Sequence, residues 1–451
     1  MNRMEELKEL KELKEKMYIP GILNTQRTFG KEKNKFLYLC EPDDKELPYF
    51  YIPYEIPHNF EKKRISLYIT FSFKHWDLEL PVGNITQNFG SIEDPLHYYE
   101  YSLYCNELNC SIKKFTNTAL KRVQDYSCDL LLRKANVFTI DGQESIDLDD
   151  GLSVDSEKVS VYISLVPYVI DKLNLWDSFT TRISNIYLPD RRHVMMPSVI
   201  STLCSLNEKQ ERACLVLDFY FSGQTSLSVC KVKVAKNFSY AETSLSEYAD
   251  YIKLLSISGC DNSHELVQHY MIKFNTYCAS ILKKGIFSVT VKPDELPHYL
   301  LPVYYKQYSQ YEYKGDYIQI TSPIRRLVDI INMYHLCVEQ NLLTFKDITF
   351  CDKWYTEIER LNAALRRVRK SQNQCKMLDI ATREQSNIFK AVLFEKETDK
   401  LFKYKIYIPE LKLTSSIKTD KDFDNFVEKD VILYVFQDEK RLKKKIRFQL
   451  T

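Results

Sequence analysis

Four aspartates lie close together in the stretch FTIDGQESIDLDDGLSV, which runs from residue 138 to residue 154. They are Asp141, Asp147, Asp149 and Asp150, and apolar residues that favour β-strands stand on either side of them. Carboxylates this close repel one another unless a cation or protons intervene, at a cost on the order of 4 kcal/mol for each close pair. Because oxygen-only ligands favour Mg²⁺ or Mn²⁺ over zinc, the spacing indicates a site for a divalent cation.

The local backbone decides whether these carboxylates can share an ion. An extended segment would place Asp147 and Asp149 on one face, and a turn at Asp150 and Gly151 would bring a third carboxylate round to them. An EF-hand loop counted from Asp147 is excluded, because Gly151 and Lys158 stand where that loop needs an Asp or Asn and a Glu. A solvated acidic turn without a metal remains the alternative interpretation of the spacing alone.

A second segment, YIQITSPIRRLVDIINMYHL, has the residues of an anion site. We expect Ser322 to cap a helix that begins at Pro323, which places Arg325 and Arg326 in its first turn. The free backbone N–H groups and the positive end of the helix dipole there, joined by two guanidinium groups, would bind phosphate. The alternative is that the arginines lie on the helix surface, paired with Asp329.

A third segment, ISNIYLPDRRHVMMP, places Tyr187 beside a rigid Leu-Pro turn and next to Arg191 and Arg192. A tyrosine ring can stack on a nucleic-acid base, and the neighbouring arginines can contact phosphates. A Tyr187 ring packed in the hydrophobic core is equally compatible with this pattern.

The chain that must position these residues has 451 amino acids, enough for roughly two to four domains. Its 44% apolar and 27% charged residues are typical of a globular protein, and no apolar run is long enough to span a membrane. The net charge of +2 means that any nucleic-acid binding would use a local groove. The N-terminal MNRMEELKELKELKEK lacks an apolar signal core, so we expect the 12 cysteines to be reduced thiols.

The pattern along the chain predicts four parts. Residues 1–17 form a short amphipathic helix with many Glu–Lys pairs, and residues 18–116 contain short β-rich runs typical of a small barrel. Residues 117–385 form a mixed α/β region that opens with a helix over 117–135 and ends in helices. Residues 386–451 return to strands and predict a second small barrel.

Taken in chain order, the three segments resemble the signatures of the ribonuclease II family. The catalytic RNB domain of that family hydrolyses RNA from the 3′ end. TIDGQESIDLDDGLS resembles its aspartate motif, RISNIYLPDRRHVMMPSVISTLCSL its second motif and ITSPIRRLVDIIN its third. The weaker VKVAKNFSYAE and HELVQHYMIKFN fall between the second and third motifs. The resemblance implies a multidomain α/β fold, in which a mixed α+β RNB catalytic domain is flanked by OB-fold β-barrels of the cold-shock type.

The resemblance also implies an activity, namely metal-dependent 3′-to-5′ hydrolysis of single-stranded RNA to nucleoside 5′-monophosphates. Asp141, Asp149 and Asp150 would hold Mg²⁺, with Mn²⁺ as a possible substitute. Asp149 would be the carboxylate on which activity depends most, and Asp147 would help to shape the catalytic site.

The remaining motif residues would contact RNA. By the same resemblance, Arg325 would clamp the phosphate near the scissile bond, and Tyr187 would stack at the RNA 3′ end. Arg191 and Arg326 would be further RNA-binding residues.

The chain also departs from the family pattern. Gln268 and His269 stand where the family has two glutamates, and Met333 lies where a histidine is expected. The segment YISLV over residues 162–166 lacks a family histidine and aspartate. The chain is therefore identified as a diverged member, and the alternative is an RNA-binding protein of the same fold with weak or no catalytic activity.

The expected partner is single-stranded RNA, with no membrane association and no exosome tether, because the endonuclease domain of the exosome-bound members is absent from the sequence. We expect a monomer in the cytoplasm, with a nuclear location left open.

Overall fold

A computed structural model gives the structure of most of the chain. The described residues are 17–57, 64–289, 298–300, 316–347, 349–383, 388–398, 400–411, 413–437 and 444–451. The predicted amphipathic helix over residues 1–17 lies outside them, apart from Met17. The chain divides into two compact units, of which the first comprises Met1–Asn109, Tyr187–Arg192 and Arg367–Thr451 and the second comprises Cys110–Ile186 and His193–Arg366. The four predicted domain boundaries stay predictions.

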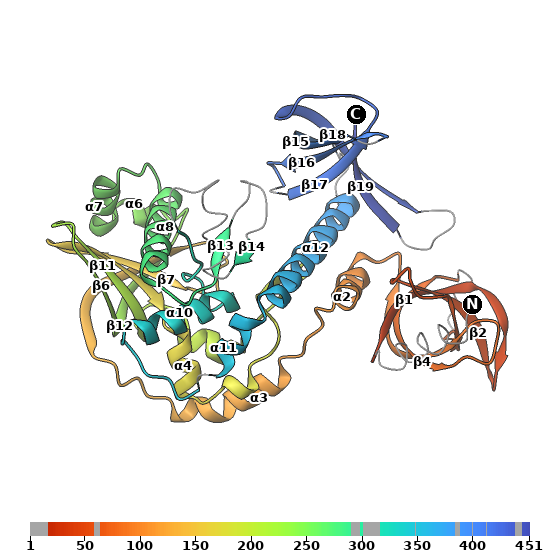
Figure 1. Ribbon diagram of the computed structural model, residues 1–451, viewed down its shortest axis with the longest axis horizontal. Helices are drawn as coiled ribbons and strands as arrows, with labels where there is room; N and C mark the ends of the chain where they lie inside the picture. The colour runs from red at the N-terminus through yellow and green to blue at the C-terminus, as the bar shows by residue number, and fades with distance from the viewer. Residues whose placement is uncertain are drawn as a thin grey trace. The chain divides into compact units, whose positions relative to one another are not determined.

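The first unit begins with a closed five-stranded barrel in the order β1-β2-β3-β5-β4 (Figure 1). Alternating apolar side chains fill its interior, and Leu23, Phe50, Ile52 and Phe71 are fully buried. Its strands are β1 (Ile19–Glu32), β2 (Lys35–Pro42), β3 (Phe50–Tyr54), β4 (Leu67–His75) and β5 (Val82–Ser91).

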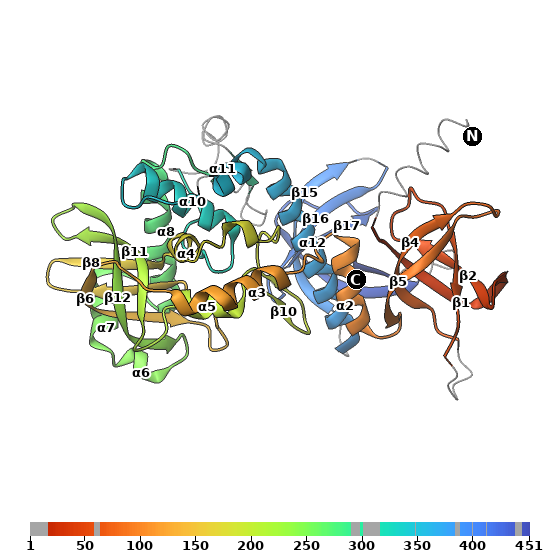
Figure 2. The same cartoon turned by 90° about the horizontal axis from the view of Figure 1, so that it is seen from below.

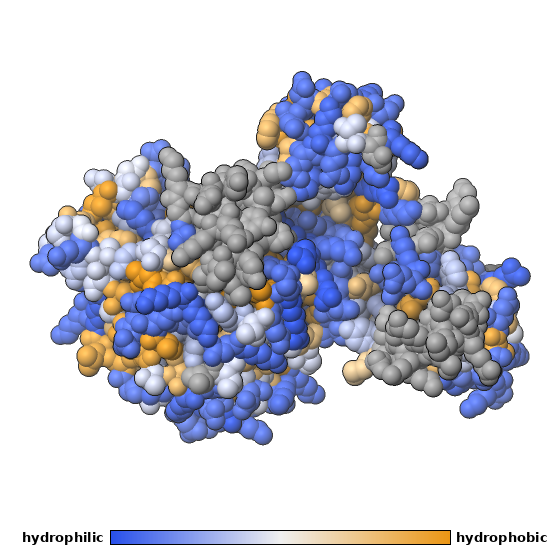
Figure 3. Space-filling view, viewed as in Figure 1, coloured by the Kyte–Doolittle hydropathy of each residue, from blue (hydrophilic) through white to orange (hydrophobic). Residues whose placement is uncertain are grey.

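The C-terminal strands of the first unit form an antiparallel five-stranded sheet in the order β17-β16-β15-β18-β19, whose end strands β17 and β19 lie in contact. Its core contains Leu393, Tyr404 and Ile406. On the side of the molecule drawn in Figure 3, the surface of this sheet is mostly hydrophilic. Its strands are β15 (Ile388–Thr398), β16 (Phe402–Ile408), β17 (Leu413–Thr419), β18 (Val427–Gln437) and β19 (Lys444–Leu450).

Two helices complete the first unit. They are α2 (Pro95–Cys105) and the part of α12 (Ile358–Arg383) that follows residue 366. The hydroxyl groups of Ser102 and Ser371 share a hydrogen bond between these helices, and the Tyr99 hydroxyl donates to Asp379 Oδ1 at 3.1 Å. These hydrogen bonds between side chains hold α2 against α12.

The second unit is built on another closed five-stranded barrel, in the order β11-β12-β6-β7-β8. Strands β12 and β6 run parallel, and the other neighbouring strands are antiparallel. The strands are β6 (Leu132–Asp141), β7 (Asp150–Val154), β8 (Lys158–Ser164), β11 (Glu211–Tyr220) and β12 (Thr225–Ser239). Short strand pairs outside the barrel are β9 (Ile186–Tyr187) with β10 (Arg192–His193), and β13 (Phe287–Val289) with β14 (His298–Leu300).

Helices surround the barrel of the second unit. Both views show α4 and α10 beside its strands (Figures 1 and 2), and α4 contacts both β11 and α10. The helices are α3 (Lys113–Arg122), α4 (Val166–Lys172), α5 (Ser198–Cys204), α6 (Thr243–Ser246), α7 (Ala249–Ser258), α8 (Ser263–Ile281), α10 (Leu327–Glu339), α11 (Thr349–Thr356), and the 3-10 turns η1 (Val123–Asp125) and η2 (Trp176–Ser178).

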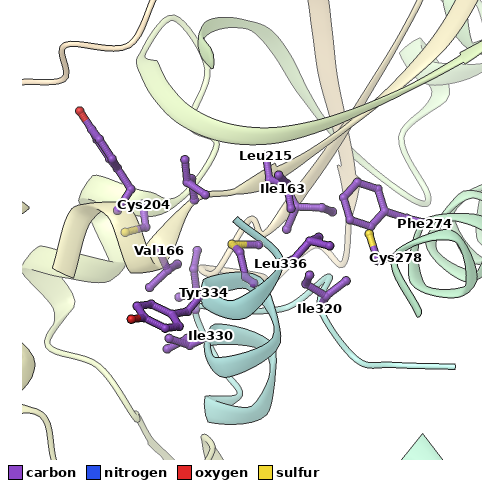
Figure 4. Close-up of a cluster of buried hydrophobic side chains, with 14 of the residues drawn as sticks. Ile163, Val166, Cys204, Leu215, Phe274, Cys278, Ile320, Ile330, Tyr334 and Leu336 are labelled. Atoms are coloured by element: carbon purple, nitrogen blue, oxygen red, sulfur yellow. The ribbon is translucent and has the colours of Figure 1, made fainter. Parts of the chain in front are cut away.

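The main hydrophobic core of this unit lies between the barrel and α10. Ile163 and Leu215 of the barrel face the same cluster as Phe274 of α8 and Leu336 of α10 (Figure 4). Every residue of α10 from Leu327 to Cys337 is buried. Because this helix is enclosed on all sides, the segment that precedes it is held firmly in place.

The prediction of a helix over residues 117–135 is wrong in its second half. Helical structure covers Lys113–Arg122 and Val123–Asp125, whereas Leu132–Asp141 is strand β6. Leu132 and Arg133 pair with β12, and Val137 and Phe138 farther along β6 are buried in two different hydrophobic clusters, so that strand pairing overrides the local helical pattern. All 12 cysteines are free thiols, as expected. Among the described residues, no helix is long and apolar enough to cross a membrane.

Candidate active site

The aspartate segment connects two neighbouring strands of the second barrel. Asp141 is the last residue of β6 and Asp150 is the first residue of β7, and these strands pair through Phe138 and Leu152. Strand pairing therefore brings the two ends of the segment to the same edge of the sheet. Burial raises the pKa of Asp150 well above its usual range, and the neighbouring charges of Asp141 and Asp149 raise it further.

The backbone between these strands is fixed by hydrogen bonds from β8 and the end of α5. The Ser164 N–H donates to Asp149 O at 2.8 Å, and the Leu206 N–H donates to Leu148 O at 2.9 Å. The Ser205 hydroxyl donates to Ile146 O at 3.2 Å. The end of the segment is thus tied to the barrel at Leu148 and Asp149, whereas residues 142–146 are exposed.

Asp149 is the most deeply buried of the four aspartates, with 2% of its surface exposed. Its Oδ1 accepts a hydrogen bond from the Ile324 N–H at 2.8 Å, and its Oδ2 lies 3.4 Å from Arg325 Nε. Burial raises the pKa of Asp149 to about 7, although the Arg325 charge and the Ile324 N–H act in the opposite direction. Two motifs that are far apart in the sequence therefore meet at Asp149.

The arginines do not lie in the first turn of a helix as predicted. Helix α10 begins at Leu327, and its N-cap is Arg326 in an extended conformation, with φ −138° and ψ 127°. The Ser322 N–H donates to Asp329 Oδ1 at 2.7 Å, which holds residues 322–326 in a separate turn. The Ser322 hydroxyl accepts from Arg325 Nη2 at 3.0 Å instead of capping the helix.

The two arginines have different surroundings. Arg325 reaches Asp149 and keeps a side chain that is half exposed. Arg326 donates through Nη2 to the buried Asp329 at 2.8 Å, as the alternative interpretation of this pair predicted for it. Only Arg325 thus combines contact with the aspartates and access from solvent.

Asp147 is held by a residue that the sequence analysis did not single out. Asn185 Nδ2 donates to Asp147 Oδ2 at 3.0 Å. Its position in the segment ISNIYLPDRRHVMMP was the signal that could have identified it, although only the fold brings its amide to the aspartate segment.

Tyr240 is a second residue that the sequence analysis missed. Its N–H donates to Asp141 O at 3.0 Å, and its ring stacks on His264 with ring centroids 3.8 Å apart. Burial, together with the charges of Asp150 and Asp141, raises the pKa of the Tyr240 hydroxyl to about 12. Its position in the weak motif VKVAKNFSYAE was the signal that could have identified it.

The other predicted RNA-binding residues belong to the first unit. Tyr187 is 48% exposed, so its placement in a hydrophobic core is wrong, and its N–H donates to Gln372 Oε1 at 2.9 Å. Arg191 forms an ion pair with Glu100, and its Nε lies 3.5 Å from Asp190 Oδ2. The roles predicted for these residues stay predictions.

The two residues that stand in place of the family glutamates lie on α8. Gln268 is exposed and His269 is half buried. Burial and the Lys273 charge lower the pKa of His269, so this side chain is neutral at pH 7 and does not replace the charge of a glutamate.

The chemistry of the aspartates fits a divalent cation. Asp141 Oδ2 and Asp149 Oδ2 are buried atoms that accept no hydrogen bond, and burial raises the pKa of Asp141 to about 6. Such hard oxygen atoms, left unsatisfied beside one another's charge, are the ligands that Mg²⁺ and Mn²⁺ prefer. Within the described parts of the chain, however, no group of three or more His, Cys, Asp and Glu side chains is already arranged to hold a metal ion.

Comparison with known proteins finds a family model that matches the segment containing the four aspartates. Residues 130–254 match the family model described as RNB domain. Ribonuclease R 2 of Lactococcus lactis subsp. lactis is 35% identical over 114 residues, which are 23% of this chain and 16% of that relative. Ribonuclease R of Mycoplasmopsis pulmonis is 32% identical over 110 residues, or 23% and 15% of the two chains. The chain thus spans less than a fifth of the length of the curated relatives it matches.

Solved structures extend the likeness beyond the RNB domain. The apo form of Mycoplasma genitalium RNase R superposes with a TM-score of 0.66 and 15% identity, over 95% of this chain and 86% of that one. Yeast Ssd1, described as a pseudonuclease, gives a TM-score of 0.57 and 13% identity, over 90% and 65% of the two chains. These likenesses confirm the predicted fold class, a mixed α/β domain accompanied by OB-type β-barrels. Residues 130–254 thus match the RNB domain, and the fold of the chain is similar to that of ribonuclease R.

Proposed function

We propose that this protein is a 3′-to-5′ exoribonuclease that hydrolyses single-stranded RNA to nucleoside 5′-monophosphates with the help of Mg²⁺ or Mn²⁺. The observation that carries the proposal is the junction at Asp149, where a buried, unsatisfied carboxylate meets the half-exposed Arg325. The RNB domain and the relatives named ribonuclease R support this assignment. Mycoplasma genitalium RNase R has been solved in complex with ribose-methylated single-stranded RNA and with double-stranded RNA.

In the proposed site, Asp141, Asp149 and Asp150 hold the cation. A divalent cation bound there supplies a more acidic water molecule and neutralises charge on the phosphate. Arg325 binds the phosphate, because its guanidinium group is accessible while Asp149 orients it through Nε. Asp147 shapes the site through its effect on Asp149, whose pKa its charge raises.

The RNA-binding roles of the other residues divide according to their surroundings. Tyr187 has an exposed ring that can stack on a base at the 3′ end. Arg326 is tied to Asp329 and acts mainly by fixing the turn that carries Arg325. Arg191 is partly neutralised by Glu100, so its contribution to RNA affinity is small.

A second candidate function is RNA binding without catalysis. The observation that favours it is the pair Gln268 and His269, which carries no negative charge where the resemblance expects glutamates. The fold likeness to yeast Ssd1, described as a pseudonuclease, is in keeping with this candidate. The predicted monomeric state, cytoplasmic location and absence of an exosome tether stay predictions.

The test is an incubation of the protein with 5′-labelled single-stranded RNA in Mg²⁺, in Mn²⁺ and in EDTA. We expect a ladder of products that shorten from the 3′ end only when a metal is present, with nucleoside 5′-monophosphates released. Asp149→Asn should abolish the ladder. Asp155→Asn is the matched control, because Asp155 is an exposed residue in the β7–β8 turn, where it accepts hydrogen bonds from the N–H groups of Glu157 and Lys158. RNA binding in both metals without shortening would overturn the exonuclease and support the second candidate.

A further inference from the structure

We propose that Asn185 is a positioning residue, which fixes the Asp147 carboxylate and the backbone of Arg325 in one arrangement. This inference rests on the proposed function, because the residues that Asn185 orients are those of the proposed site. Asn185 is 4% exposed, so a bound RNA would meet Asp147 and Arg325 rather than the amide itself.

The Asn185 side chain uses both ends of its amide group. Nδ2 donates to Asp147 Oδ2 at 3.0 Å, and Oδ1 accepts from the Met195 N–H at 2.7 Å. An amide is needed for this pair of contacts, because a carboxylate of the same shape accepts but does not donate, and an alanine does neither. An asparagine at position 185 therefore suits both partners, because Asp147 needs a donor and the Met195 N–H needs an acceptor.

The backbone of the same segment fixes the turn that carries Arg325. The Asn185 N–H donates to Arg325 O at 3.0 Å, and the Leu327 N–H donates to Ile183 O at 2.8 Å. Ser184 and Arg326 form a β-bridge between these two bonds. The Arg325 backbone is thus anchored on Asn185, while its side chain remains directed to Asp149.

Asn185 consequently joins all three sequence motifs through one residue. It belongs to the second motif, where it bonds Met195, and it contacts the aspartate motif at Asp147 and the third motif at Arg325. Asp147 in turn acts on Asp149 through its charge. Loss of the amide would let the Asp147 carboxylate reorient beside the other carboxylates. Residues that hydrogen-bond the groups of a metal site usually act in this way, because they fix the orientation of those groups and so change metal affinity.

A purely structural role is the competing explanation, and Asn332 provides the matched control. Asn332 is fully buried in the same unit, and its amide bonds Ile286 N at 2.7 Å, Ile286 O at 3.0 Å and Gln319 O at 2.9 Å. All three of these hydrogen bonds join the Asn332 side chain to backbone atoms, whereas the Asn185 side chain also bonds an aspartate.

The experiment compares Asn185→Ala, Asn185→Asp and Asn332→Ala in the full-length chain. Mn²⁺ binding is followed by electron paramagnetic resonance, kcat and KM are measured on single-stranded RNA, and the fraction of folded protein is measured by circular dichroism. We expect both Asn185 variants to weaken Mn²⁺ binding about 10-fold and to lower kcat about 10-fold or more, with KM for RNA little changed. Asn332→Ala should lower stability but leave Mn²⁺ affinity and kcat per folded molecule unchanged.

Each result separates the positioning role from the proposed function. An inactive wild type whose Mn²⁺ binding is still weakened by Asn185→Ala would refute the exonuclease and support the role of Asn185. An active wild type whose Mn²⁺ affinity and kcat are unaltered by Asn185→Ala, or altered equally by Asn332→Ala, would overturn the role of Asn185 alone. Full activity of Asn185→Asp would also overturn it, because that variant keeps the Met195 bond and loses only the donor to Asp147. A wild type that neither cleaves RNA nor binds Mn²⁺ would refute both.

Discussion

Asp149 and Asp218 are both buried aspartates on or beside the same five-stranded barrel, with 2% and 4% of their surface exposed, yet they have opposite surroundings. Asp218 accepts from Arg133 Nη2 at 2.7 Å, from the Ser160 hydroxyl at 2.6 Å and from Lys158 Nζ at 3.1 Å. Burial by itself would raise the pKa of Asp218, but these donors outweigh it and the pKa is lowered. At Asp149 the balance is reversed, and burial raises the pKa to about 7.

This difference separates a carboxylate that stabilises the fold from one available for chemistry. A buried charge with a full set of donors is stabilised where it stands, whereas Asp149 keeps one oxygen without a hydrogen bond. Strand β6 contributes to both surroundings, with Arg133 near its first residue and Asp141 at its last. Three buried carboxylate oxygens without a hydrogen bond, those of Asp141, Asp147 and Asp149, belong to the segment that begins at the Asp141 end, which is where we place the cation.

The largest expected effect is the loss of activity in Asp149→Asn. We expect kcat on single-stranded RNA to fall by roughly a thousandfold or more, because the variant removes a proposed metal ligand and the partner of Arg325. The free energy of unfolding should be unchanged or higher, since the raised pKa means that the folded protein disfavours the ionised form of this side chain. Single-turnover kinetics and urea unfolding measure the two quantities. A stable variant with more than a tenth of wild-type kcat would contradict the assignment.

Asp218→Asn should produce the opposite pair of changes. We expect the free energy of unfolding to fall by about 3 kcal/mol, because the variant leaves Arg133 and Lys158 without their buried partner. The kcat per folded molecule should stay near that of the wild type. If Asp218→Asn instead lowers kcat and leaves stability intact, the distinction between the two aspartates fails.

The pH dependence of stability gives a third, smaller effect. The pKa of Asp218 is lower in the folded than in the unfolded protein, so its contribution is present above the unfolded value and is lost as the pH falls through the folded value. We expect part of the acid destabilisation of the wild type, below about pH 4, to be absent from Asp218→Asn. Urea unfolding in EDTA across this pH range measures it, and parallel curves for both proteins would refute the proposed linkage.

The smallest effect is expected at the exposed pair of Arg191 and Glu100. Arg191→Ala should change the free energy of unfolding by less than about 1 kcal/mol and RNA affinity by less than about threefold, because surface ion pairs are weak. Fluorescence anisotropy with labelled RNA measures the affinity. A tenfold loss would mean that Arg191 leaves Glu100 to bind RNA directly.

Residue type and short spacing were enough to single out the aspartates as a cation site and Arg325 as part of an anion site. Their common site was predicted only by the family resemblance, because Asp149 and Arg325 are far apart in the chain and meet only in the fold. The barrels were also predictable, since short runs of β-forming residues such as KFLYLC are typical of strands.

The predicted start of the helix is wrong because long-range contacts compete there with the local sequence signals. Ser322 and Pro323 form a standard helix start, but Asp329 takes the Ser322 N–H and residues 183–185 pair with residues 325–327, so the helix begins later. A capping preference contributes about 1 kcal/mol, which tertiary hydrogen bonds can outweigh. The contacts of Asn185 could not be predicted for the same reason, since its partners become neighbours only in the folded chain.

If the cation site is formed by aspartates with an oxygen that accepts no hydrogen bond, and not by buried carboxylates in general, Mn²⁺ binding must distinguish Asp149 from Asp218. Electron paramagnetic resonance measures Mn²⁺ binding to the wild type, Asp149→Asn and Asp218→Asn. We expect the wild type and Asp218→Asn to bind Mn²⁺ with similar affinity and Asp149→Asn to lose this binding. Equal binding by all three proteins, or no binding by the wild type, would contradict this expectation.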